Sequence, residues 1–318
     1  MVVSLFIFSF NMHNNSLILF IKKLILFLIL VFILDLSIGF VLKRLYFKIP
    51  RKITYGILDT KEDVLIYGSS KAYRNYNPSI FKEKLGLSCF NNGMDGQNIY
   101  YHYALLASSI ERYKPKLVLL DLFDVDYTIT SSDWSMDRLN VLLPFYGQNK
   151  SINEVIELRS KYEKIKMLSS IYPYNSLFVD ILKSIHLKKD STFGSQGYLP
   201  AQKQVGMIDR MTKFNFKKDS AEDQIKTLYL KKIFQICKQK DIKLVVIMSP
   251  MYSENAAQPK ILEKIAVENQ IPFWNFTHIS LFADISLFSD PAHLNETGAN
   301  KYSLFIAEKI EKELFKNK

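Results

Sequence analysis

The sequence contains little cysteine, glycine or proline for its length. Only two cysteines occur among 318 residues, Cys89 and Cys237, which excludes a disulfide-stapled scaffold and a CxxC metal site. Cys89 falls in an expected strand and Cys237 in an expected helix, so we predict two buried free thiols. Glycine (11) and proline (10) are sparse, and we find neither a low-complexity tract nor a repeat of fixed period. This excludes solenoid and propeller arrays.

Positive charge is abundant but is not gathered into a patch. The formal net charge is +11, yet basic residues are dispersed and no aromatic-interleaved basic motif occurs, so we predict no nucleic-acid partner. The dispersed residues include Lys150, Lys161, Lys188, Lys217, Lys231 and Lys240. Part of the excess lies beside an N-terminal apolar segment, where contact with a membrane surface is the natural explanation.

A nearly unbroken apolar run of 19 residues covers 24–42, LILFLILVFILDLSIGFVL. At about 1.5 Å per residue it reaches roughly 28 Å, close to the thickness of a hydrocarbon core. Only Asp35 interrupts it, at a cost of a few kcal/mol near the bilayer centre, which the other residues can offset. The alternative is a cleaved signal peptide, for which Ser37-Ile38-Gly39 is a poor cleavage site. We therefore predict one uncleaved transmembrane helix.

The charges that flank this run leave its orientation open. Lys22 and Lys23 precede it, and five cations follow it: Lys43, Arg44, Lys48, Arg51 and Lys52. The positive-inside rule would place the large domain in the cytoplasm, whereas the function inferred below requires it outside. The organisation we expect is a tail (1–23), the anchor (24–42), a linker (43–60) and one α/β domain (61–318).

Within that domain, short apolar runs alternate with amphipathic segments. Strands are expected at 64–67, 88–91, 116–122, 243–248 and 272–275, and helices at 78–85, 98–112, 221–238, 260–268 and 296–315. The run KLVLLDL (116–122) has the continuous apolar character of a strand covered on both faces. Leu304, Ala307, Ile310 and Leu314 recur on one face of the last helix. The pattern predicts a three-layer α/β/α sandwich with a mostly parallel sheet, which binds ligands at the carboxyl ends of its strands.

Residues 127–219 lack this alternation and are expected to form a largely helical insertion or lid. Many aromatic residues lie there: Trp134, Phe145, Tyr146, Tyr162, Tyr172 and Tyr174. We expect them to form the core of the insertion; a sugar-binding platform is the alternative.

Three loops at the same expected edge of the sheet carry polar residues. Gly68-Ser69-Ser70 follows the first strand, and Asp290-x-x-His293 precedes the last helix. A serine hydroxyl needs a base to act as a nucleophile, and a histidine base needs a carboxylate to orient it. The serines alone could merely cap a turn, but with Asp290 and His293 present we predict a catalytic site at Ser70. Gly96, in NNGMDGQN (91–98), and the Ser70 amide are candidate oxyanion donors, although Gly96 could serve only the turn.

This order of motifs resembles the SGNH (GDSL-like) hydrolase superfamily. Ser70 matches the family's serine, with Ser69 where aspartate is common; Gly96 matches the glycine of its second block, and Asp290 and His293 match its last block. The resemblance covers about residues 63–126 and 243–316. It implies an SGNH-type sandwich, a Ser70–His293–Asp290 triad, an oxyanion hole that includes Ser70 and Gly96, and no cofactor.

The third block departs from the family. An asparagine is usual there, but DLFDVDY (121–127) places Val125 at that position. Loss of one oxyanion donor costs about two to three orders of magnitude in rate. Asn92, Gln97 and Asn98 are candidate substitutes.

The layout is similar to membrane-anchored members that act in surface-polysaccharide O-acetylation and teichoic-acid alanylation. That similarity implies an esterase or acyltransferase working on a glycan or other acylated substrate outside the membrane, with a membrane acyl-donor protein as a candidate partner. Two alternatives remain open: an inactive scaffold in a glycan-assembly complex, favoured by Val125, and a cytoplasmic lipid esterase, favoured by the basic flank at 43–52.

Three acidic residues after the third strand have the appearance of a metal cluster: Asp121, Asp124 and Asp126. No histidine accompanies them, so we expect solvated loop residues or site polarity and no metal. His102 and His278 have no evident partner and are expected to be structural.

Overall fold

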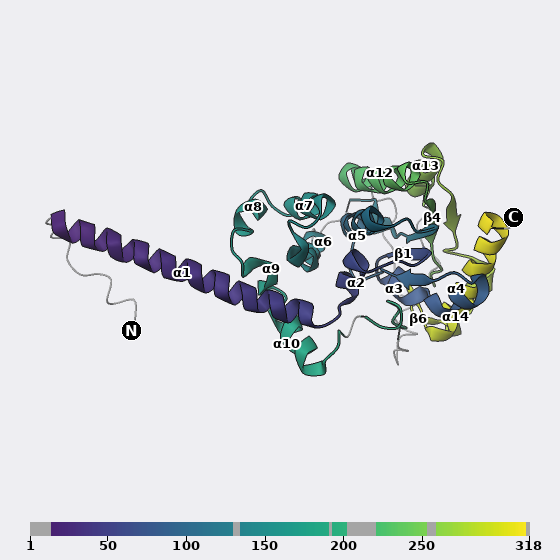
Figure 1. The fold of residues 1–318 in the computed structure, drawn as a ribbon. Helices are drawn as coiled ribbons and strands as arrows, with labels where there is room; N and C mark the ends of the chain where they lie inside the picture. The colour runs from purple at the N-terminus through teal and green to yellow at the C-terminus, as the bar shows by residue number, and fades with distance from the viewer. Residues whose placement is uncertain (1–13, 130–133, 191–192, 202–220, 253–258, 316–318) are drawn as a thin grey trace.

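The computed structural model describes residues 14–129, 134–190, 193–201, 221–252 and 259–315. Its first element, α1 (Asn14–Lys48), projects from the globular part as a single long helix (Figure 1). Within residues 16–48 of this helix an 18-residue stretch has a mean hydropathy of 3.0, and the helix has the length and composition of a membrane span or of a signal sequence. The apolar run 24–42 is thus the central part of a longer helix.

The segment expected as a linker is mostly helical. Its first residues continue α1 to Lys48, and a second helix, α2 (Lys52–Leu58), follows almost at once. Lys52, Ile53 and Ile57 of α2 are buried. Because α2 packs against α5 (Ile99–Arg112), this part of the chain belongs to the domain core and does not act as a flexible tether.

Five parallel strands form the central sheet, in the order β2-β1-β3-β4-β5. They are β1 (Val64–Gly68), β2 (Cys89–Asn91), β3 (Leu117–Asp121), β4 (Lys243–Met248) and β5 (Phe273–Asn275). Nearly every residue of β1, β3 and β4 is buried, as expected for strands covered on both faces. The α/β fold expected from the alternating pattern is confirmed.

Alternate residues of β1 point into two separate cores. Leu65 and Tyr67 belong to the larger core, and Val64 and Ile66 to the smaller one. Helices α2, α5 and α12 (Gln224–Gln239) cover the first face, and α4 (Pro78–Leu85) and α14 (Glu296–Ile310) cover the second (Figure 1). Helix α13 (Lys260–Glu268) adds Leu262 and Ile265 to the larger core.

Two local details refine the expectations. Cys89 and Cys237 are both free and buried, as expected. Leu304 is exposed although Ala307 and Ile310 are buried, so the inward face of α14 is rotated toward Tyr302 and Ile306. A π-helical turn, η6 (Glu311–Phe315), extends α14.

The described part of the insertion is mostly helical up to Leu187, whereas residues 193–201 form turns and isolated β-bridges. A short 3-10 helix, η2 (Asp124–Asp126), precedes the insertion. The helices of the insertion are α6 (Trp134–Asp137), η3 (Arg138–Phe145), α7 (Lys150–Glu157), α8 (Glu163–Lys166), α9 (Tyr172–Asn175) and α10 (Phe178–Leu187). Phe145 and Tyr174 are buried and contact Tyr46 of α1, whereas Tyr162 is exposed. The side chain of Trp134 and residues 202–219 lie outside the described part.

Candidate active site

Ser70 is the first residue of α3 (Ser70–Asn75), which begins directly after β1. The chain turns at Gly68, where φ is +150° and a Cβ would lie 2.3 Å from the carbonyl oxygen of Asp121. Only glycine tolerates this close approach to β3. The turn places Ser70 at the carboxyl edge of the sheet, where ligands bind in parallel α/β folds.

Asp290 and His293 lie on a two-stranded antiparallel hairpin, β6 (Phe288–Asp290) and β7 (His293–Leu294). The Asp290 carboxylate accepts hydrogen bonds from the backbone N–H groups of Ala292 (2.9 Å) and His293 (3.0 Å). The short spacing therefore forms a hairpin turn that closes on the aspartate side chain. The short 3-10 helices η4 (Ser280–Phe282) and η5 (Ile285–Leu287) connect β5 to this hairpin.

The three side chains form one hydrogen-bonded chain. The Nε2 atom of His293 lies 2.7 Å from Oγ of Ser70, and its Nδ1 atom lies 2.8 Å from both carboxylate oxygens of Asp290. An ionised carboxylate only accepts, so Nδ1 carries the proton and Nε2 is left to accept from Ser70. This arrangement has the geometry of a serine nucleophile with an oriented base.

Burial would raise the pKa of Asp290, but the hydrogen bond and charge of His293 and the two backbone N–H groups together lower it below its usual value. Asp290 therefore stays ionised near neutral pH. That charge is what a histidine base needs in order to become an imidazolium during a proton transfer.

Asn75 connects the helix that carries Ser70 to the strand that carries His293. Its Oδ1 accepts from the backbone N–H of Leu294 (3.0 Å), and its Nδ2 donates to Oγ of Ser249 (3.1 Å). Asn75 and Ser249 are both fully buried. These bonds hold Ser70 and His293 at a set separation, because breaking a buried polar pair costs the desolvation of both groups.

A buried lysine adjoins the serine. The Nζ atom of Lys71 donates to the carbonyl oxygen of Ser249 (2.8 Å). Burial lowers the pKa of Lys71 to about 8, and the charges of Asp121, Asp124 and Asp126 oppose that shift. Of the two roles expected for these acids, solvated loop residues or site polarity, the first is wrong for Asp121 and Asp126, which are buried; burial raises the pKa of Asp126 to about 7. Within the described part of the chain, no group of acidic, histidine or cysteine residues is placed to hold a metal ion.

An open cavity of about 520 Å³ lies at the triad, a size common for small-molecule sites. The residues that line it are Ser70, Arg74, Asp95, Leu199, Pro200, Ala201, Ser289, Asp290 and His293. Arg74 and Asp95 form a salt bridge (2.5 Å) on its wall, and Arg74 also donates to the carbonyl oxygen of Leu199 (3.4 Å). The sequence analysis missed this pair, because nothing local marks Arg74 and Asp95 as neighbours.

Two backbone amides are candidates for an oxyanion hole. Among the described residues, no protein group accepts a hydrogen bond from the amide of Ser70 or of Gly96. Gly96 has a φ of +70°, and the guanidinium of Arg138 packs so closely that a Cβ on Gly96 would lie 2.7 Å from it. Arg138 is a second residue near the site that the sequence analysis missed.

The three side chains suggested as substitute donors do not line the cavity, and neither does Gly96. The Asn98 oxygen caps α5 through the amides of Tyr100 and Tyr101, and Gln97 donates to the carbonyl oxygen of Arg138 (3.1 Å). Asn92 is buried against Gly56 of α2, and its side-chain oxygen and nitrogen have no hydrogen-bond partner in the described part of the chain.

Val125 also lies outside the cavity lining; its carbonyl oxygen accepts from Lys226 (2.9 Å). The two histidines that were expected to be structural do not line the cavity. His102 is fully buried in α5, where burial lowers its pKa to about 3, and His278 is exposed. His102 is therefore neutral and packs as a core residue, as expected.

No family model matches the chain, and no curated protein matches it. Solved structures with a related layout include a protein of Desulfitobacterium hafniense assigned to the G-D-S-L lipolytic family (9% identity, TM-score 0.38, covering 77% of this chain and 98% of that one). An acetyl xylan esterase is also similar (12% identity, TM-score 0.38, covering 79% of this chain and 100% of that one). So is a family two carbohydrate esterase of Clostridium thermocellum (10% identity, TM-score 0.36, covering 79% of this chain and 63% of that one). The interpretation of the site rests on this chain's own residues.

Proposed function

We propose that the protein is a membrane-anchored serine esterase or O-acyltransferase that acts on ester groups, O-acetyl groups above all, of a cell-surface glycan. The observation that carries the proposal is the hydrogen-bonded chain from Ser70 through His293 to Asp290 at the mouth of a cavity. The same three side chains serve hydrolysis and transfer alike, since the two reactions differ only in whether water or a sugar hydroxyl accepts the acyl group.

In the proposed mechanism, Oγ of Ser70 attacks the ester carbonyl while its proton passes to Nε2 of His293. Asp290 stabilises the imidazolium, and the Ser70 and Gly96 amides stabilise the negative oxygen. The tetrahedral intermediate expels the alcohol, which takes the proton from His293 and leaves an acyl-serine. Water or a sugar hydroxyl then gives its proton to His293 and attacks the acyl carbon, and the proton returns to Ser70.

The packing of α1 supports a retained anchor over a cleaved signal sequence. Leu42 and Tyr46 of α1 are buried in the larger core, and Asp35 hydrogen-bonds to Ser169 and Ser170 of the insertion. Cleavage near Gly39 would remove Asp35 and leave those two serines without this partner. The end of α1 around Leu42 and Tyr46 therefore belongs to the fold of the domain, and we propose that the apolar run before it crosses the membrane.

The side of the membrane and the partner follow from the glycan substrate. Two of the five cations after the apolar run are used within the domain: Arg51 lies over the ring of Tyr46 (4.5 Å), and Lys52 donates to the carbonyl oxygens of Gly93 and Gly197. Their structural roles offer a reason for their presence other than topology. We propose that the domain lies outside the cytoplasmic membrane and that a membrane acyl-donor protein is its partner.

A specific observation favours an inactive scaffold as the second candidate. Val125, Asn92, Gln97 and Asn98 are not among the residues that line the cavity, so the oxyanion donors proposed here are two backbone amides. A site with one fewer donor loses about 10²–10³ in rate.

Covalent labelling separates the two candidates. The full chain in detergent is incubated with a fluorophosphonate, and adducts are located by peptide mass. An adduct on Ser70 that is absent from Ser70→Ala and from His293→Ala supports the enzyme. No adduct on protein with a normal melting temperature would favour the scaffold. Release of acetate from an acetylated glycan by the wild-type chain, and not by Ser70→Ala, then tests the substrate class.

A further inference from the structure

The part of the insertion that contacts α1 exposes large apolar side chains. On the α8–α10 segment (residues 159–189), Leu168 is 77% exposed, Ile165 65% and Val179 72%. Tyr162, Phe178 and Leu182 of the same segment are also exposed. Scattered apolar residues on a surface are ordinary, but a group of this size on one short segment marks an interaction surface.

Hydrogen bonds attach this segment to α1 at Asp35. Asp35 of α1 accepts from Oγ of Ser169 (2.5 Å) and from the backbone N–H of Ser170 (2.6 Å). Gly39, one turn further on, packs so closely that a Cβ there would lie 2.3 Å from Cβ of Ser170. Helices α9 and α10 also contact α1. In Figure 1, α8 and the chain leading to α9 form the edge of the globular part that faces the free length of α1.

The positive charges on α1 indicate how deep Asp35 lies in the membrane. Lys22-Lys23 and Lys43-Arg44 bracket the apolar run, and the 20 residues from Lys23 to Lys43 rise about 30 Å, equal to a hydrocarbon core. Asp35 comes eight residues before Lys43, so it lies about 12 Å inside the nearer membrane boundary. Ser169 and Ser170 must lie at that depth too, with Leu168 and Ile165 beside them.

The charged groups beside the turn at residues 165–170 are paired, whereas Lys161, Asp180, Lys183, Lys188 and Lys189 of the segment are exposed. Glu163, whose side chain is 1% exposed, pairs with Arg159 (3.4 Å) and Lys166 (2.8 Å) and accepts from the hydroxyl of Tyr172 (2.7 Å). The Asp35 carboxylate is likewise held by Ser169 and Ser170. Ionisable groups at membrane depth are tolerated when they are paired in this way.

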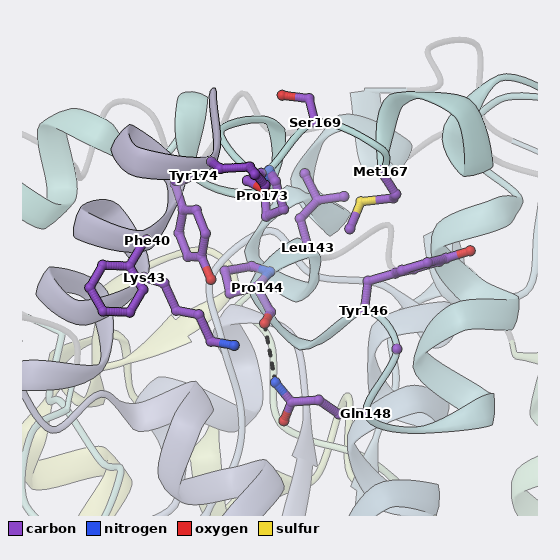
Figure 2. Close-up of a pocket in the computed structure, with 14 residues that line it drawn as sticks. Phe40, Lys43, Leu143, Pro144, Tyr146, Gln148, Met167, Ser169, Pro173 and Tyr174 are labelled. Atoms are coloured by element: carbon purple, nitrogen blue, oxygen red, sulfur yellow. Dashed lines mark hydrogen bonds between the residues drawn. The ribbon is translucent and has the colours of Figure 1, made fainter. Parts of the chain in front are cut away.

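A cavity of about 650 Å³ lies between the segment and the part of α1 from Leu36 to Lys43. Its lining is mostly apolar, with Phe40, Leu143, Met167 and Tyr174 among the residues drawn in Figure 2. Lys43 reaches into this cavity from α1 (Figure 2). An apolar space with an amine at the level of the membrane boundary suits a lipid chain whose anionic headgroup meets Lys43.

We propose that the α8–α10 segment is immersed in the lipid leaflet around α1, with the turn at residues 165–170 reaching into the hydrocarbon. This rests on the proposed membrane span but does not depend on catalysis. The bilayer is thus the partner that covers Ile165 and Leu168, and the segment fixes the height and tilt of the domain above the membrane.

The test uses the full chain with single added cysteines, Leu168→Cys, Ile165→Cys, Leu30→Cys and Val267→Cys, each labelled with bimane. Cys89 and Cys237 are buried, and the unsubstituted chain gives the background. Labelled protein is reconstituted in phosphatidylcholine vesicles with or without bromine on the acyl chains. Val267, on α13, is 72% exposed and serves as the matched position away from α1.

We expect brominated lipid to quench the labels at 168, 165 and 30, and to leave the label at 267 unchanged. Quenching at 30 without quenching at 168 and 165 would overturn the immersion and leave the anchor intact. Loss of quenching at 30 as well would overturn both the span and the immersion. Ester turnover by the same samples reports on the proposed activity separately.

Discussion

Asp290→Asn isolates the electrostatic role of the triad from its structural role. Asparagine keeps an oxygen that can accept from the backbone N–H groups of Ala292 and His293, which Asp290 now binds at 2.9 and 3.0 Å. Its NH₂ group, however, faces Nδ1 of His293, where both carboxylate oxygens now lie at 2.8 Å. Nδ1 must then accept, so the imidazole proton moves to Nε2, which can no longer take the proton of Ser70.

The expected loss in kcat is about 10⁴-fold, or about 5 kcal/mol of transition-state stabilisation. The assay is turnover of an aryl acetate, together with the rate of fluorophosphonate labelling at Ser70. Asp284→Asn is the matched control, because Asp284 also accepts from the backbone of its own turn, at Ser286 (2.8 Å). Turnover by Asp290→Asn within tenfold of the wild-type chain, at equal melting temperature, would refute the tautomer argument.

Three further predictions concern residues around the site. Burial raises the pKa of Asp126 to about 7, so the folded protein binds a proton at Asp126 more tightly than the unfolded chain does. The stability gained from this proton is fully present below pH 4 and is lost as the pH rises through about 7. The loss amounts to about 4 kcal/mol in the free energy of unfolding. Asp126→Asn should remove that slope from denaturant titrations at pH 5 and 8, and an unchanged slope would contradict the assignment. Gly96→Ala should lower ester turnover at least about tenfold because the added Cβ displaces Arg138. Its control is Gly86→Ala, at a φ of +66° in open space, which should cost only about 1–2 kcal/mol of stability. Equal turnover in the two variants would argue against a role for the Gly96 loop. Asn75→Ala removes the partner of the Leu294 amide and of the Ser249 hydroxyl, so we expect a loss of about 1–3 kcal/mol in stability. We also expect kcat to fall by more than KM changes. An unaltered kcat would show that the hairpin is positioned without Asn75.

Local patterns were sufficient to predict the sheet and to indicate that Ser70, Asp290 and His293 lie at one edge of it. Continuous apolar runs at 64–67, 116–122 and 243–248 correspond to β1, β3 and β4, because a strand covered on both faces admits few polar residues. Asp290 and His293 are three residues apart, so a single hairpin turn brings them together. Parallel strands end at one edge of the sheet, and this rule predicts that Ser70 lies near them.

Tertiary packing decided what surrounds those residues. Asn75 meets Leu294 across 219 positions, and Asp35 meets Ser169 across 134; no spacing rule relates positions so far apart. Burial of Asp121 and Asp126, and the use of Asn98 as a helix cap, depend on which neighbours cover them. The sequence by itself determined the strands, the apolar helix and the close pairing of Asp290 with His293, because these follow from residue type and short-range order. The structure alone decided which polar groups are paired and how the insertion lies against α1, because those follow from contacts between distant segments.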